Sequence, residues 1–482
     1  MSQSEPERSH ADSPLHLVFV PFLERSHFAP LAAKAASSAA AGAEHEVAAT
    51  TTAAIVTTAH FAALAPASVP VHAAPLRCPG GYEDFSLLPD DASAAPTFFA
   101  AAEAALAPAL TAAIRAHHHG GGGGRPVAVV SDAVLYWAPR VARDCGVPHV
   151  TFHTIGAFAA AAMVALHLYR PEVHTDRFAV PGGFPRPVTI HRAQVNEEAL
   201  AHLPLFRAAE AQSCAVVFNS VAALDADFAA YYRSQLPGTP KEVFLVGPTV
   251  SPSPLAVASG GTERDPILQW LDGRDEGSVV YVCFGSTCSL GETQLRELAT
   301  GLRASGRPFV WVVSTTPRGD GGCAEREARA SSNGMVVAGR WAPQAEILAH
   351  RAVGGFVTHC GWNSVLEAVS AGVPLATWPL RAEQFLNELF LVEVLRVGVR
   401  VRESDLEAVV PADAVVRAVG RLMGDDQQDE EVLAARKARS RELGAAARAA
   451  VAEGGSSSGD WARLVYELKA FHGRHNDPQT YK

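Results

Sequence analysis

The sequence alternates short runs of β-branched and aliphatic residues with alanine-rich stretches, and it does so twice. In the first half, strands are expected at 15–22, 45–51, 69–76, 127–132 and 149–154, and helices at 28–41, 96–117 and 136–145. In the second half, strands are expected at 279–285, 308–314, 335–338, 355–358 and 375–378, and helices at 292–305, 363–371 and 383–397. Strands that alternate with helices form parallel sheets covered by helices. The sequence therefore predicts an α/β protein with two doubly wound, Rossmann-like domains.

The length of the chain agrees with two domains. Its 482 residues exceed the roughly 250 to 300 at which single cores stop growing. The segment 248–261, PTVSPSPLAVASGG, has the proline, serine and glycine content that is typical of a linker between domains. We expect an N-terminal domain at 1–247, a linker at 248–262, a C-terminal domain at 263–455, and a C-terminal helix and tail at 456–482. That last segment is expected to pack back on the N-terminal domain.

The charge of the chain limits its partners. Lysine and arginine total 40 against 50 aspartates and glutamates, which gives a formal net charge of −10. A broad basic field for nucleic acid or anionic lipid is therefore not expected. Any phosphate that the protein binds must be held by local groups.

The termini and cysteines indicate the compartment. Residues 1–14 are polar and charged and lack the apolar core of a signal peptide, and we find no later run of about 18 apolar residues, so no membrane span is expected. The seven cysteines include no C-x-x-C pair, which argues against a disulfide framework or a zinc site. We expect a cytoplasmic protein, a monomer, without a metal.

Polar residues gather where a predicted strand gives way to a helix near residue 360. Asn363 and Ser364 stand at expected cap positions, Gly361 allows close approach of the backbone, and the unpaired amides of a first helical turn favour an anion. Glu367 lies one turn further on, where a carboxylate accepts hydrogen bonds from ribose hydroxyls. The pattern predicts a phosphate site, although an ordinary turn with good caps has the same spacing.

A candidate base lies in the first half. His27 follows the first strand and Asp132 ends the fourth, so both are expected at the carboxyl edge of the sheet, where open α/β sheets bind ligands. A histidine supported by a buried aspartate is a base whose imidazolium is stabilised after it takes a proton. The chain has 19 histidines, and spacing alone leaves open that His27 is an ordinary surface residue.

The segment 341–384, WAPQAEILAHRAVGGFVTHCGWNSVLEAVSAGVPLATWPLRAEQ, resembles the signature box of plant secondary-product glycosyltransferases, the UDP-sugar-dependent family 1 enzymes. The similarity extends to Phe284-Gly285-Ser286 and to Trp270-Leu271-Asp272. The resemblance implies the GT-B fold, in which two Rossmann-like domains face each other across a cleft.

The resemblance also implies a donor site along this box. For uridine it implies stacking by Trp341, a backbone bond from Ala342, and ribose contacts from Gln344 and Glu367. The residues that it implies for the diphosphate are His359, Asn363, Ser364 and Ser286. Those that it implies for the sugar are Trp362, Glu383 and Gln384.

In the first half, Ser26-His27-Phe28-Ala29-Pro30 is similar to the Gly-His-x-x-Pro motif of the family. By that similarity His27 is the catalytic base, Asp132 is its acidic partner, and Thr154 touches the sugar. The chain departs from the family at Ser26, where glycine is usual. A serine there is expected to cap the helix that begins near Phe28.

The resemblance implies an inverting transferase that moves glucose from UDP-glucose to a hydroxyl of a hydrophobic plant metabolite, either a flavonoid or other phenolic or a triterpenoid or steroid. UDP-sugar is then a co-substrate, and no cofactor is needed. A UDP-glucuronate donor, paired by Arg25 or Arg381, stays open. So does a nucleotide-sugar sensor without turnover, whereas the lack of G-x-G-x-x-G weighs against an NAD-dependent oxidoreductase. The acceptor pocket is expected at loops 79–88, 158–163 and 178–192.

Overall fold

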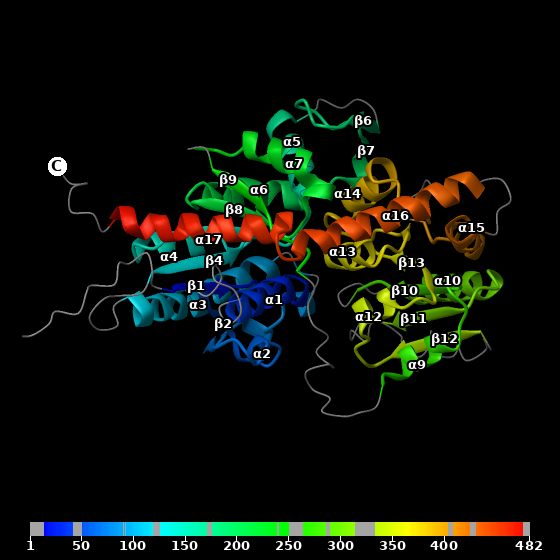
Figure 1. Ribbon diagram of the computed structural model, residues 1–482, viewed down its shortest axis with the longest axis horizontal. Helices are drawn as coiled ribbons and strands as arrows, with labels where there is room; N and C mark the ends of the chain where they lie inside the picture. The colour runs from blue at the N-terminus through cyan, green and yellow to red at the C-terminus, as the bar shows by residue number, and fades with distance from the viewer. Residues whose placement is uncertain are drawn as a thin grey trace, which may run out of the picture.

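The computed structural model describes residues 14–41, 51–89, 91, 93–118, 126–170, 176–238, 241–249, 264–285, 290–313, 333–402, 408–424 and 430–475. Within these residues the chain forms two parallel sheets that lie side by side, each with helices on its faces (Figure 1). The prediction of two doubly wound α/β units is confirmed.

The first sheet has the strand order β3-β2-β1-β4-β5-β8-β9, and all its pairs are parallel. Its strands are β1 (Leu15–Val20), β2 (Thr51–Thr58), β3 (Val71–Ala74), β4 (Val127–Asp132), β5 (His149–His153), β8 (Ala215–Phe218) and β9 (Glu242–Leu245). Every residue of β1 and β4 is buried, as expected for strands covered on both faces. The strand order reverses between β1 and β4, so the ends of these two strands border a crevice.

The second sheet has the order β12-β11-β10-β13-β14-β15 and is also parallel. Its strands are β10 (Val279–Cys283), β11 (Phe309–Val313), β12 (Gly334–Ala338), β13 (Val353–Thr358), β14 (Leu375–Thr377) and β15 (Gly398–Arg400). Here the order reverses between β10 and β13. A separate antiparallel pair, β6 (Arg177–Ala179) and β7 (Thr189–His191), lies outside both sheets.

Helices cover the sheets and connect them. In the first half they are α1 (Arg25–Ala41), α2 (Ala59–Ala62), α3 (Ala94–His118), α4 (Ala138–Asp144), α5 (Ala157–Tyr169), α6 (Glu197–Glu210) and α7 (Ala222–Ser234). In the second half they are α9 (Pro266–Asp272), α10 (Glu292–Ala304), α12 (Gln344–Ala349), α13 (Trp362–Ala371), α14 (Gln384–Leu389), a π-helix (Phe390–Val394), α15 (Ala412–Met423), α16 (Glu430–Val451) and α17 (Ser456–His475). Where the two halves meet, Phe158 of α5 stacks on Phe390 with ring centroids 4.7 Å apart.

The helix α17 returns to the first sheet (Figure 1). Leu464, Val465 and Leu468 belong to the same apolar core as β1, and the ring of Trp461 lies 6.4 Å from that of Phe19. Leu245 donates its backbone N–H to the Asp460 carboxylate at 2.9 Å. The last described helix is therefore part of the N-terminal core. The exact domain boundaries stay a prediction, and residues 250–262 of the predicted linker lie outside the described residues.

One described helix, α3, is long and apolar enough to cross a membrane by length and composition alone. The apolar run in this region was not expected from the sequence. Core helices of soluble proteins pass the same test, and Phe98, Ala102, Leu106 and Leu110 of α3 are fully buried in the N-terminal core. The absence of a membrane span stays a prediction.

Candidate active site

His27 and Asp132 meet at the crevice between β1 and β4. Nδ1 of His27 lies 2.8 Å from Oδ2 of Asp132, and the carboxyl group is buried with a side-chain exposure of 1%. The other oxygen, Oδ1, accepts the backbone N–H of Val134 at 3.1 Å. Thr154, directly after β5, places its Oγ1 3.1 Å from the same Nδ1. Because Nδ1 is held by these neighbours, Nε2 is the nitrogen of His27 that is left for a substrate.

The charge on His27 depends on its acidic neighbours. Burial alone lowers the pKa of His27, but the charge and hydrogen bond of Asp132, with the charges of Glu24 and Glu383, raise this pKa from 6.5 to about 9. The imidazolium form is thus stabilised, which is what a base requires after it has taken a proton.

The polar cluster after β13 forms the start of α13. The helix begins at Trp362, and Gly361 is its N-cap without a side-chain cap bond. The expectation that Asn363 and Ser364 cap the helix is therefore wrong, because both lie inside the first turn. With no side-chain cap, the first-turn amides are available to an anion, as the phosphate prediction requires.

His359 lies beside this turn and is held neutral. Burial, and then the positive charge of Arg381, lower the pKa of His359 from 6.5 to about 4. A Cβ atom at Gly361 would lie 2.4 Å from Nε2 of His359, and one at Gly285 would lie 2.7 Å from it, so both glycines make room for the imidazole. Within the described part of the chain, Nδ1 of His359 and Oδ1 of Asn363 are buried without a hydrogen-bond partner. Buried polar atoms of this kind are expected to meet a ligand or water.

The residues predicted for uridine form a connected group. The amide of Gln344 donates to Oε2 of Glu367 at 2.6 Å and to Oγ of Ser364 at 2.9 Å. Burial raises the pKa of Glu367 to about 7, although the bond from Gln344 opposes this. Trp341, three residues before Gln344 in the chain, is 47% exposed, so its ring is accessible for stacking. Ala342 next to it is buried.

The three residues predicted to contact the sugar, Trp362, Glu383 and Gln384, differ in burial and in hydrogen-bond partners. Gln384 is buried, and its Oε1 accepts the backbone N–H groups of Leu380 and Arg381 at 2.9 Å each. Glu383 is half-buried; burial raises its pKa, and it acts electrostatically on His27. The indole N–H of Trp362 already donates to the backbone carbonyl of Asn219 at 2.7 Å. The sugar contacts of these three residues stay predictions, and Ser286 lies outside the described residues.

Ser26 does not cap α1. The helix begins at Arg25, one residue before Ser26, and the serine hydroxyl donates to Oε1 of Glu24 at 3.0 Å. Its carbonyl accepts the side-chain amide of Asn363 at 2.6 Å. The residue that replaces the usual glycine therefore contacts the opposite half of the molecule through its backbone.

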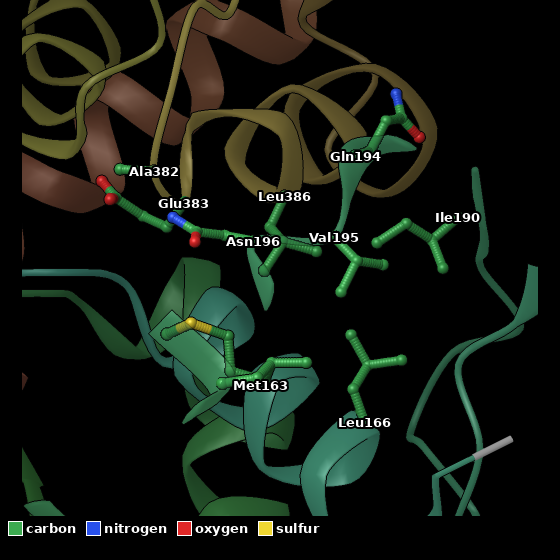
Figure 2. A pocket seen from close by; sticks show the side chains of 10 residues that line it. Met163, Leu166, Ile190, Gln194, Val195, Asn196, Ala382, Glu383 and Leu386 are labelled. Atoms are coloured by element: carbon green, nitrogen blue, oxygen red, sulfur yellow. The ribbon is translucent and has the colours of Figure 1, made fainter. Parts of the chain in front are cut away.

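An apolar pocket lies beside Glu383 (Figure 2). Met163 and Leu166 of α5 line it from one side and Leu386 of α14 from the other, with Ile190 of β7 also in its wall. Two of the three segments expected to contact an acceptor, 158–163 and 178–192, contribute to this lining. The first was expected to be a loop and is instead part of α5.

Two residues of the site were missed from the sequence. Tyr281 of β10 donates its hydroxyl to Oε1 of Gln344 at 3.2 Å, and nothing in a buried strand distinguishes this tyrosine from a core residue. Asn219 directly follows β8, and a polar residue at the end of a buried strand was a usable signal. Within the described residues, no group of three His, Cys, Asp or Glu side chains could hold a metal.

The C-terminal half matches a known family profile. Residues 266–434 match the profile described as UDP-glucoronosyl and UDP-glucosyl transferase. Among curated relatives, UDP-glycosyltransferase 73B4 of Arabidopsis thaliana is 37% identical over 370 residues, which cover 71% of this chain and 74% of the relative. UDP-glucose flavonoid 3-O-glucosyltransferase 7 of Fragaria ananassa is 36% identical over 380 residues, or 71% of this chain and 75% of the relative.

The chain belongs to the plant family 1 UDP-glycosyltransferases. Among solved structures, UGT73P12 of Glycyrrhiza uralensis, complexed with glycyrrhetinic acid 3-O-monoglucuronide, is similar with a TM-score of 0.79 at 28% identity. The similarity covers 96% of this chain and 97% of that one. This glycosyltransferase thus has the GT-B fold, takes a UDP-sugar donor and acts on a small-molecule acceptor. The predicted family, fold and enzyme class are confirmed.

Proposed function

We propose that this UDP-glycosyltransferase transfers glucose from UDP-glucose to a hydroxyl group of an aromatic plant metabolite and inverts the anomeric centre. The observation that carries the proposal is the contact between His27 and Asp132 at the crevice of the first sheet, 2.8 Å long and facing the start of α13. A supported base and an anion-binding helix start then stand on opposite sides of one cleft.

The reaction follows from these positions. Nε2 of His27 takes the proton of the acceptor hydroxyl, and Asp132 stabilises the imidazolium. The acceptor oxygen forms a bond to the anomeric carbon while the bond from that carbon to the diphosphate oxygen breaks, and UDP leaves with the electron pair. The first-turn amides of α13 and His359 receive the diphosphate, so fixed donors stabilise its charge. Attack from the face opposite the diphosphate inverts the centre.

An aromatic acceptor is favoured by the surroundings of His27. The ring of Phe22 meets His27 edge-on with centroids 5.5 Å apart, and Phe99 stacks on Phe22 at 5.2 Å. Phe85 and Tyr136 extend this group, and both are only half-buried. Aromatic walls bind flat aromatic rings through offset or edge contacts. The named relatives include a flavonoid glucosyltransferase and scopoletin glucosyltransferase of Nicotiana tabacum, which agrees with a phenolic acceptor.

The pocket beside Glu383 is aliphatic rather than aromatic. Met163, Leu166 and Leu386 supply flexible apolar surface there. The pocket has room for about one water, so these aliphatic side chains are suited to contact the edge of an acceptor and not to enclose a large one.

A second donor, UDP-glucuronate, is kept as an alternative because of Arg381. This exposed residue lies close enough to His359 and Glu383 to act electrostatically on both. A guanidinium there would pair with the carboxylate of the sugar, whereas Glu383 would repel it. Arg25, the other candidate, is exposed at the start of α1.

Competition between donors tests the proposal. The wild-type enzyme is incubated with a panel of phenolic and triterpenoid acceptors and equal concentrations of UDP-glucose and UDP-glucuronate, and products are identified by mass spectrometry. Glucosides are expected as the main products. Glucuronides that disappear in Arg381→Ala would replace the glucose assignment, and no transfer with any acceptor would favour a sensor.

We also propose that the enzyme works without a metal, as a monomer, in the cytoplasm. Fixed N–H donors at α13 take the place of a cation at the diphosphate. A rate that is unchanged by EDTA, together with a monomeric mass in light scattering, is the expected result.

A further inference from the structure

Two neighbouring side chains at the start of α13 cross to the N-terminal half. The indole of Trp362 donates to the carbonyl of Asn219 at 2.7 Å, and the amide of Asn363 donates to the carbonyl of Ser26 at 2.6 Å. Asn219 follows β8, and Ser26 precedes His27 in the chain. The helix start that receives the diphosphate is thus fastened at two separate points to the half of the molecule that carries the base.

The indole of Trp362 also fills the space over Gly156. A Cβ atom at Gly156 would lie 2.8 Å from Cη2 and Cζ2 of the indole, closer than such atoms approach in folded proteins. The backbone of Gly156, with φ −72° and ψ 151°, has a conformation that any residue adopts. The absence of a side chain at Gly156 is therefore required by Trp362 and not by the backbone.

Gly156 belongs to the turn that carries a predicted sugar contact. It caps α5 two residues after Thr154, whose hydroxyl lies 3.1 Å from Nδ1 of His27. Behind this turn, the carboxylate of Asp225 accepts the backbone N–H groups of Ala157 at 3.0 Å and Phe158 at 3.1 Å. The turn is thus fixed from one side by a buried carboxylate and from the other by the indole.

We propose that Trp362 is a positioning residue, and that its indole acts as a wedge between Gly156 and the carbonyl of Asn219. The wedge sets the separation between the start of α13 and the turn that carries Thr154, and so the alignment of donor and base. This inference rests on the proposed transfer reaction, in which the acceptor oxygen must approach the anomeric carbon in line with the leaving diphosphate. A displacement of about 1 Å in such an alignment costs on the order of 10²-fold in rate.

Gly156→Ala tests the wedge with a single methyl group. The methyl group collides with the indole and shifts the turn of α5 relative to α13, so kcat is expected to fall by about tenfold or more. The Kd of UDP is expected to change by less than about threefold, because Gln344 of α12 and Glu367 of α13 keep their bond within the C-terminal half. Gly291→Ala is the matched control, because Gly291 is also an extended N-cap and a Cβ atom there would meet nothing within 4 Å. The control is expected to keep the wild-type kcat. Wild-type kcat in Gly156→Ala would overturn the proposal.

A double-mutant cycle identifies the partner. Trp362→Phe shortens the side chain and removes its far ring, so adding Gly156→Ala to it should cost less than about threefold in kcat, far less than in the wild-type background. Equal costs in the two backgrounds would overturn the wedge. If Gly156→Ala alone does not fold, hydrogen exchange in Trp362→Phe decides, because loss of a sugar contact would also lower kcat in that variant. Faster exchange at the first turn of α5 than in the wild type supports the wedge, and unchanged exchange contradicts it.

A measurement without turnover separates this inference from the reaction on which it rests. Amide hydrogen exchange in the UDP-bound protein should be faster at the first turns of α5 and α13 in Gly156→Ala than in Gly291→Ala. Unchanged exchange would overturn the wedge even in an active enzyme. Failure of wild-type protein to glucosylate any acceptor would instead refute the proposed donor and acceptor. The exchange measurement would still test the wedge, because it needs no turnover.

Discussion

Both sheets carry a histidine and other polar groups where the strand order reverses. The pKa of the histidine is raised at the first sheet and lowered at the second. At the first sheet, the Asp132 carboxylate raises the pKa of His27 to about 9. At the second sheet, burial and Arg381 lower the pKa of His359 to about 4, and burial raises that of Glu367 to about 7. One site therefore carries an ion pair at neutral pH, whereas the other holds its histidine neutral.

This difference matches the tasks proposed for the two sites. A base must take a proton during the reaction, so a stabilised imidazolium is useful at His27. A site for a leaving diphosphate must stabilise charge without moving protons, and a neutral His359 beside unpaired amides does so. The same fold thus supports two chemistries because the neighbours of each histidine differ, Asp132 in one case and Arg381 in the other.

Removal of the base should have the largest effect. In His27→Ala, kcat is expected to fall by about 10²- to 10⁴-fold, because general-base help is worth this much. The Kd of UDP should stay near its wild-type value, since Gln344 and Glu367, predicted to bind uridine, lie on helices of the C-terminal half. Initial rates and calorimetry measure the two quantities. A nearly normal kcat would show that the ion pair of the first sheet is not the base.

The pH profile should separate the two histidines. Because the pKa of His27 is raised to about 9, the imidazole is protonated and inactive below that value, so kcat/KM should rise about tenfold per pH unit as pH approaches 9. Asp132→Asn removes the carboxylate and should move the midpoint to lower pH while reducing the maximum rate. A profile that is flat from slightly acidic pH up to about 9 would contradict the role of the ion pair.

The donor site of the C-terminal half is tested by removing the predicted stacking contact between Trp341 and uracil. Trp341→Ala should weaken UDP binding by about 1–3 kcal/mol, the usual value of stacking between a base and an aromatic ring. Gln384→Ala should leave the Kd of UDP nearly unchanged and reduce discrimination among UDP-sugars. Calorimetry with UDP and competition between UDP-glucose and UDP-galactose measure these effects. Equal losses of UDP affinity in both variants would remove the distinction between uridine and sugar contacts.

The smallest expected effect concerns Tyr281. Tyr281→Phe removes the hydroxyl that donates to Gln344, and should weaken UDP binding by about 1 kcal/mol, the usual net value of one hydrogen bond. Tyr466→Phe is the matched control, because Tyr466 on α17 is 73% exposed. Titration calorimetry compares the two variants. An identical UDP affinity in both would mean that Tyr281 does not support the donor site.

Strands with a strong local signal were predictable from the sequence. The bounds of β4, Val127–Asp132, are the predicted ones, since a run of buried valines ends in a polar group. The strand expected at 45–51 falls largely outside the described residues, and β2 instead occupies Thr51–Thr58. In its sequence, TTAAIVTT, six of the eight residues are threonine, isoleucine or valine, so a strand signal was present and the expected range was placed too early in the chain. The helix expected at 383–397 is split by the π-helix at Phe390–Val394, whose packing on Phe158 is a long-range contact.

The candidate site was predictable residue by residue but not in its internal bonds. The contact between His27 and Asp132 was expected because His27 was placed after the first strand and Asp132 at the end of the fourth, both at the carboxyl edge of a parallel sheet. The structure places His27 in the first turn of α1 and Asp132 at the end of β4, which pairs with β1. The bond from Trp362 to Asn219 joins residues far apart in the chain, so no local pattern contains it. The same holds for Ser26, whose hydroxyl was expected to cap a helix and instead bonds Glu24.

The return of α17 to the first sheet constrains how the protein is made. Leu464, Val465 and Leu468 complete the same core as β1, although hundreds of residues separate them in the chain. During synthesis the first strand leaves the ribosome long before the helix that covers it. The core of the N-terminal half is therefore complete only after α17 has been synthesised, which is after the second sheet, so the two halves of the enzyme reach their final packing together.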